Sequence, residues 1–150
     1  MNNAPNNNPV SSYKYMVKLI SLTCVILLPL VMFMLGRDML SLNLKDKYLW
    51  LGAGIFILVS VARHIYYKMQ FKSVSEPSKS SSANLEQLGS GIMIRSGIME
   101  VPSLFSVAMF STAKSYNLGL IIISVLSGLS ILLFIRKEDE LMALANKKQN

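Results

Sequence analysis

The sequence predicts an all-α, polytopic membrane protein with four transmembrane helices in two antiparallel hairpins and both termini in the cytoplasm. Three observations predict this class. Of the 150 residues, 52% are hydrophobic and 15% are charged, and the mean hydropathy is +0.44, whereas a soluble domain carries about 25% charged residues. The apolar residues gather in four blocks close to membrane-spanning length. Lysines and arginines fall mainly at the ends of these blocks, more on one side than on the other.

The chain begins with a predicted disordered polar leader at residues 1–15, because residues 1–12 hold five asparagines and two prolines without an apolar pattern. The first span follows at 16–35 and is long enough to cross about 30 Å of hydrocarbon. A cleaved signal peptide is the competing interpretation. The block is long for that, and Met34 stands where a cleavage site needs a small residue. We therefore expect a retained helix, bent at Pro29.

The other predicted spans are residues 48–67, 92–112 and 117–135, which complete a four-helix membrane domain at 16–137. Residues 68–91 are rich in serine and are expected to form a flexible cytoplasmic loop. The last two spans must form an antiparallel hairpin, because the turn between them is very short. Residues 138–150 form a charged cytoplasmic tail, most of which is able to extend the fourth helix into water.

Charge and aromatic residues predict the orientation of the spans. All six tyrosines lie at or just outside a predicted helix end, as in the aromatic belts of membrane proteins. Arg95 lies near the side that collects ten lysines and arginines, while the other side collects four, namely Arg37, Lys45, Lys47 and Lys114. The positive-inside rule then places both termini and the loop at 68–91 in the cytoplasm, and we expect a bacterial inner membrane.

Several function classes are disfavoured. The single cysteine, Cys24, and the single histidine, His64, form no multi-residue metal site. No phosphate-binding glycine loop and no nucleophile elbow occurs in the sequence. The net charge of +7 is spread over the ends of apolar blocks, so it does not indicate nucleic-acid binding. We therefore expect a non-enzymatic protein with no metal and no cofactor, whose partners are the lipid bilayer and other membrane subunits or further copies of itself.

Glu100 is the carboxylate that lies well inside a predicted span, about 12 Å beyond its cytoplasmic start. An acidic side chain there costs about 2.5–3.5 kcal/mol on insertion scales and should face a partner or water. Pro102 removes a helical hydrogen bond beside it. Arg95 and Arg63 are the candidate partners. Three roles stay open: an ion pair that fixes helix packing, a proton- or cation-binding site, and a contact with a partner subunit.

Small residues predict where helices approach closely. Gly52 and Gly54 lie early in the second span, and Ser124 and Gly128 form a small-xxx-small pattern in the fourth. We expect these four positions to serve helix packing.

Two resemblances accompany these observations. Residues 97–110, which place a glutamate at the head of a run of small and apolar residues, resemble the outer helix of the rotary-ATPase proteolipid subunit. That resemblance implies that Glu100 carries a proton or a sodium ion. Residues 84–137 are similar to small uncharacterised four-helix membrane proteins of Bacteroidetes and related bacteria, through Arg95, Glu100, the Leu104-Phe105 pair and the turn at 114–117. This second resemblance implies the four-helix architecture and no particular activity.

The sequence as a whole predicts a non-enzymatic inner-membrane protein with an intramembrane polar site at Glu100, acting as a small subunit of a membrane complex or as a homo-oligomer. The alternative is proton- or cation-coupled transport, or proteolipid-like ion translocation, through Glu100.

Overall fold

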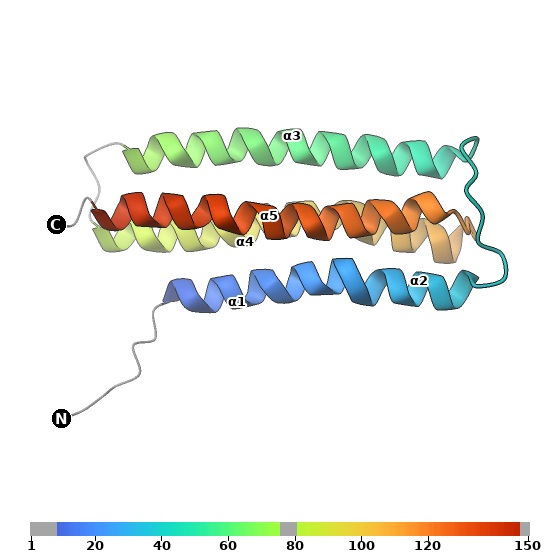
Figure 1. The fold of residues 1–150 in the computed structure, drawn as a ribbon. Helices are drawn as coiled ribbons and strands as arrows, with labels where there is room; N and C mark the ends of the chain where they lie inside the picture. Colours follow the sequence, from blue (N-terminus) through green and yellow to red (C-terminus); the bar gives the residue numbers. More distant parts are fainter. Residues whose placement is uncertain (1–8, 76–80, 148–150) are drawn as a thin grey trace, which may run out of the picture.

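A computed structural model describes residues 9–75 and 81–147 as a bundle of long helices (Figure 1). The first rod consists of α1 (Pro9–Leu22), the π-helical η1 (Thr23–Leu27) and α2 (Leu28–Gly36). The other three are α3 (Lys47–Ser75), α4 (Ser81–Thr112) and α5 (Leu118–Lys147). Four stretches in the described part are long and apolar enough to cross a membrane: Tyr13–Gly36, Lys47–Lys72, Gly89–Thr112 and Leu118–Ile135. The predicted all-α class with four spans is confirmed.

The helices extend beyond the predicted spans. Residues 9–15 of the predicted leader belong to α1, while residues 1–8 lie outside the described residues. Most of the predicted loop at 68–91 is helical, because α3 continues to Ser75 and α4 begins at Ser81. Lysine, methionine, glutamine and leucine flank the serine-rich centre of that segment and favour helix, which outweighs the modest helix propensity of serine. The fourth helix continues through the predicted tail to Lys147.

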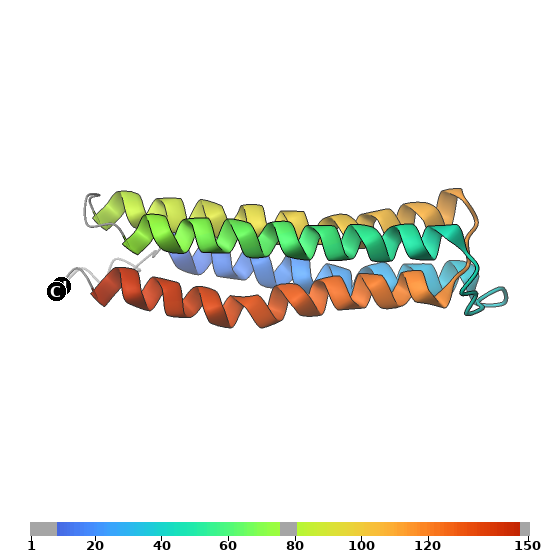
Figure 2. The ribbon, with the colours of Figure 1, turned by 90° about the horizontal axis from the view of Figure 1, so that it is seen from above.

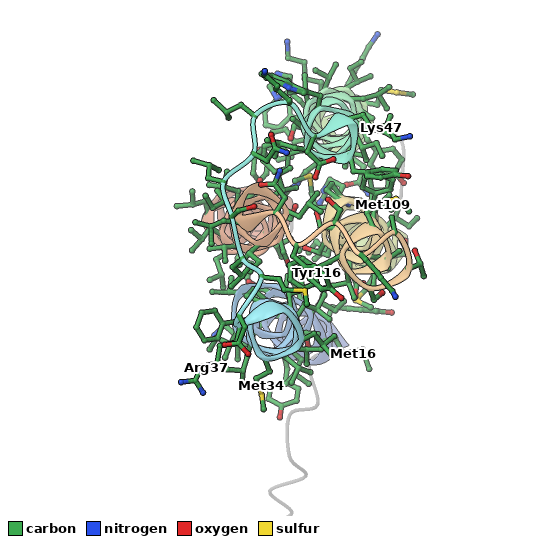
Figure 3. All side chains as sticks on the ribbon, turned by 90° about the vertical axis from the view of Figure 1, so that its right-hand side faces the viewer. Met16, Met34, Arg37, Lys47, Met109 and Tyr116 are labelled. Atoms are coloured by element: carbon green, nitrogen blue, oxygen red, sulfur yellow. The ribbon has the colours of Figure 1, made fainter. Side chains whose placement is uncertain are left out.

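The helices α4 and α5 pack on each other at the level between α3 and the first rod (Figure 1). Seen from above, they lie on the two sides of α3 (Figure 2). The α1–α2 rod packs on one side of this pair and α3 packs on the other. The first two spans therefore run antiparallel without forming the expected hairpin. The connection between them, residues 37–46, instead passes across the end of the central pair (Figure 3). There the backbone N–H of Ser41 donates to the Tyr116 carbonyl at 3.1 Å, and that of Leu118 donates to the Ser41 carbonyl at 3.0 Å.

Most of the apolar side chains in the four spans point outward. The buried share of the most apolar window of each span is between 17% and 39%. Large side chains on the outer surface include Met34, Leu58 and Leu133, which are 72%, 68% and 74% exposed. Such an apolar surface is unfavourable in water and is what a bilayer requires of a spanning bundle. The chain is thus a multi-pass membrane protein.

Small residues and serine hydroxyls line the contact between α1, α4 and α5. The Ser21 hydroxyl donates to the Gly128 carbonyl at 2.8 Å, and the Ser103 hydroxyl donates to the Ser124 carbonyl at 3.2 Å. A Cβ at Gly128 would lie 2.5 Å from a Val25 methyl group and 2.9 Å from the Ser21 carbonyl oxygen. Gly128 therefore permits an approach of α5 to the first rod that a larger residue would prevent.

The two glycines of the second span behave differently. A Cβ at Gly52 would lie 3.2 Å from Ile123 of α5, so this glycine sits at a helix contact. Nothing lies within 4 Å of a Cβ built at Gly54, which is exposed. Gly54 thus makes no close helix contact within the described chain, because its side of α3 points away from α4 and α5.

Pro29 explains the π-helical segment in the first rod. The Leu28 N–H bonds the Thr23 carbonyl, a separation of five residues. In this register the Cys24 carbonyl would be bonded by the N–H of residue 29, which proline lacks. The Ser124 hydroxyl of α5 donates to the Cys24 carbonyl at 3.0 Å instead. The feature found next to Pro29, where a bend was predicted, is a π-turn whose orphaned carbonyl is satisfied by a neighbouring helix.

Ser124→Ala should lower the stability of the bundle by about 1 kcal/mol, because it leaves the Cys24 carbonyl unsatisfied away from water. Unfolding of the purified protein in detergent micelles measures the loss. Ser111→Ala is the matched control, since Ser111 is exposed and its hydroxyl bonds carbonyls of its own helix. In a Pro29→Ala background, residue 29 supplies its own N–H and the cost of Ser124→Ala should shrink. An equal cost in both backgrounds would contradict this account.

Candidate functional site

Glu100 lies near the middle of the third span. It stands twelve residues before the end of α4 at Thr112, which is about 18 Å along the helix axis. Its side chain is half-buried. Among the described residues, its carboxylate forms no hydrogen bond and no ion pair. The Cys24 thiol of η1 interacts with the Ser103 hydroxyl and lies within electrostatic range of the Glu100 carboxylate.

Arg95 is fully buried and points to α3 rather than to Glu100. Its Nη1 donates to Oε1 of Gln70. The centre of its guanidinium lies 5.9 Å and 5.8 Å from the ring centroids of Tyr66 and Tyr67, within the range of cation–π attraction. Five residues separate Arg95 from Glu100, which places the two about 140° apart around the helix. The side chains of Arg95 and Glu100 therefore lie on different sides of α4.

Arg63 is also buried and joins α3 to α5. Its Nη1 donates to the Ser130 carbonyl at 3.0 Å and to the Ser130 hydroxyl at 3.2 Å. Its guanidinium centre lies 3.8 Å from the centroid of the Phe134 ring, close enough for face-on stacking. The structure thus does not bring Arg63 or Arg95 to Glu100. Both arginines instead connect α3 to the central pair of helices.

Pro102 is buried two residues beyond Glu100, and α4 continues through it as a single helix. The Ser106 hydroxyl donates to the Pro102 carbonyl at 2.8 Å. The backbone thus departs from regular α-helical bonding in two places, at Pro102 in the helix of Glu100 and at η1 in the first rod.

A second polar cluster ties together the two connections at the opposite end of the bundle from the arginines. We name it the loop clasp, and it consists of Asn43, Asp46, Ser115 and Asn117. The amide of Asn117 donates to the Asn43 carbonyl at 2.7 Å and to Oδ2 of Asp46 at 3.2 Å, and the Ser115 hydroxyl also donates to Oδ2 of Asp46. Figure 3 looks onto this end of the bundle. The clasp fixes the start of α3 against the α4–α5 turn.

Two members of the clasp also cap helices. Oδ1 of Asp46 accepts the Tyr48 N–H at 2.9 Å at the start of α3, and Oδ1 of Asn117 accepts the Gly119 N–H at 2.9 Å at the start of α5. Sequence reasoning did not single out these residues. The available signal was an aspartate or asparagine directly before an apolar span, which is a typical N-cap position.

The clasp borders a polar cleft of about 250 Å³, which we name the loop pocket. The residues that line it come from both connections: Met39, Ser41, Asn43, Asp46, Lys114, Ser115, Tyr116 and Asn117. Desolvation acts to raise the pKa of the Asp46 carboxyl. The hydrogen bonds from Ser115, Tyr48 and Asn117 and the charge of Lys47 outweigh it, so that this pKa lies below its ordinary value.

These features define the class as a helical multi-pass membrane protein with a half-buried carboxylate in one span. No protein-family model, curated protein or solved structure matches the chain. The similarity to proteolipid subunits and to small four-helix proteins of Bacteroidetes therefore stays a prediction.

Asp46→Asn should lower stability near neutral pH and have little effect in acid. Because folding lowers the pKa of Asp46, its contribution is present above the pKa of the unfolded chain and is lost as the pH falls below about 4. Thermal unfolding in detergent from neutral pH to about pH 3 measures the difference between the wild type and the variant. Asp38→Asn, an exposed aspartate of the same connection, is the control. A difference that stays constant with pH would contradict this role.

Proposed function

We propose that this chain is a non-enzymatic protein of the bacterial inner membrane with both termini in the cytoplasm. In this proposal it associates with another membrane segment through the side of α4 that carries Glu100. The partner is a larger membrane complex or a second copy of the chain. The orientation is supported by the excess of lysine and arginine at the end where α1 begins and α5 ends.

The observation that carries this proposal is the lack of a described partner for Glu100. A carboxylate near the middle of a span costs about 2.5–3.5 kcal/mol when it is charged and unpaired. Arg63 and Arg95, the arginines inside the spans, are engaged with groups of α3, α4 and α5. A hydrogen-bond donor or a cation supplied by a neighbouring chain would remove much of that cost. Association therefore gains free energy at this position.

The surface beside Glu100 is open to a neighbouring helix. Ile94, Gly97, Val101 and Leu104 are exposed along one side of α4, and Glu100 lies at the edge of this strip. Nothing lies within 4 Å of a Cβ built at Gly97. A glycine next to a polar group permits close backbone approach and an interhelical hydrogen bond, the two features that drive association in lipid.

Cysteine cross-linking tests this interface. In a Cys24→Ala background, Gly97→Cys should form a cross-link with the partner in native membranes or with a second copy in lipid nanodiscs. Gly54→Cys is the matched control, because Gly54 is equally open but lies on α3. We expect Gly97→Cys to cross-link well above Gly54→Cys. Equal yields at the two positions, or none at Gly97→Cys, would contradict the interface.

The role of the carboxylate is tested in the same assay. Glu100→Leu should reduce cross-linking at Gly97→Cys by roughly three- to fifteenfold, the range expected from interhelical hydrogen bonds in membranes. Glu100→Gln keeps a hydrogen-bonding group and should retain part of the yield. If Glu100→Leu cross-links as well as the parent protein, the carboxylate does not contribute to association.

The alternative is translocation of protons or cations through Glu100. The π-helix η1 favours it, because Cys24 of η1 lies within electrostatic range of Glu100 and π-bulges are frequent at functional sites. Proton flux into liposomes, followed with a pH-sensitive dye, separates the two functions. If Glu100→Gln folds normally, keeps its cross-link and loses flux, translocation replaces association as the function.

A further inference from the structure

Lys114, at the rim of the loop pocket, adopts a conformation that side chains rarely take. Its φ is 52°, and no other non-glycine residue in the described part of the chain has a positive φ. The Ser115 N–H donates to the Met109 carbonyl at 3.3 Å, six residues back along the chain. Lys114 is thus the left-handed residue just past the end of α4, a position that is usually glycine. Helix termination alone would be served better by glycine than by lysine.

The polar groups at Lys114 are suited to an anion. No hydrogen bond or ion pair of its ammonium occurs within the described residues, and Ser41 and Tyr116 line the same pocket. Asp46, the other charged residue of the lining, already accepts bonds from Ser115, Asn117 and the Tyr48 N–H. Lys114 is therefore the cation of the lining that is left for a ligand, and Ser41 and Tyr116 are lining residues that carry hydroxyl groups. Residues of these types bind phosphate in proteins.

The position of the loop pocket indicates where such a phosphate would come from. The first and third candidate spans end at Gly36 and Thr112, and the second and fourth begin at Lys47 and Leu118, so the pocket lies at the headgroup level of a bilayer. Apolar side chains near it are exposed, namely Met39, Leu42, Leu44 and Trp50. Acyl chains can pack against such a surface while the headgroup enters the polar cleft.

We propose that the loop pocket binds the phosphate of an anionic lipid headgroup, with Lys114 as the charged ligand and Ser41 and Tyr116 as hydroxyl donors. This site is independent of the association proposed at Glu100. It explains why a lysine stands at a backbone position that favours glycine. Electrostatic attraction of this kind is short in range and adds to the contacts of the acyl chains.

Lipid retention measured by native mass spectrometry tests the site. The purified full-length protein is exchanged from nanodiscs of equimolar phosphatidylglycerol and phosphatidylcholine into detergent, and the bound phosphatidylglycerol is counted. Lys114→Gly and Lys114→Gln should each reduce retention by about fivefold, the effect expected of one lysine near a charged surface. Lys45→Gln is the control, because Lys45 is exposed on the same end of the bundle but does not line the pocket.

The two variants at position 114 separate loss of binding from loss of folding. Without added lipid, Lys114→Gly should raise the melting temperature by roughly 2–4 °C, because glycine fits the left-handed position, while Lys114→Gln should leave it unchanged. A more stable variant that binds less phosphatidylglycerol supports a ligand role for the ammonium. Unchanged retention in Lys114→Gln overturns the proposal, and so does an equal loss in Lys45→Gln. Binding of inorganic phosphate without lipid retention overturns the assignment to a lipid.

Discussion

The bundle depends on hydrogen bonds that run from serine hydroxyls of one helix to backbone carbonyls of another. In a bilayer, apolar side chains gain little by packing on one another, so helix contacts rest on close approach and on polar groups. The Ser21 hydroxyl of the first rod donates to a carbonyl of α5, and the Ser124 hydroxyl of α5 donates to a carbonyl of the first rod. Gly128 lets the two helices approach closely enough for both bonds. The Cys24 carbonyl that Pro29 leaves without an N–H is satisfied by this same contact. The contact with α5 therefore stabilises the irregular first rod.

The same constraint accounts for the way α3 is held. It has the smallest buried share of the four spans, so packing alone retains it weakly. Towards one end, Arg63 and Arg95 connect it to α5 and α4 through Ser130 and Gln70. At the other end, Asp46 caps it and accepts a bond from the α4–α5 turn. Polar contacts thus fix α3 at two levels, and its remaining surface is free to meet lipid.

The four spans could be predicted because hydropathy over about twenty residues is a local property of the chain. The pairing of helices could not. A ten-residue connection at 37–46 permits the second span to lie beside the first or across the central pair, and the Ser41 bridge to Asn117 selects the second arrangement. The partner of Arg95 depends on the rotation of α3 about its axis, which one sequence does not define. The helical spacing places Arg95 and Glu100 about 140° apart around α4, which accounts for their lying on different sides of that helix.

Glu100 differs from the hydrogen-bonded serines and arginines inside the spans, because no described group of this chain forms a hydrogen bond or an ion pair with its carboxylate. Ser103, Ser124 and Arg63 donate to groups on neighbouring helices of the same chain, and these contacts are explained by the stability of the bundle. The Glu100 carboxylate costs free energy without such a contact among the described residues, so stability does not explain its presence. Association and translocation both use the open side of α4, and they differ in whether the group that meets the carboxylate belongs to another protein or is a proton or cation. Gly97 favours a helix there, because an open glycine gives a neighbouring backbone the close approach that water or an ion does not require.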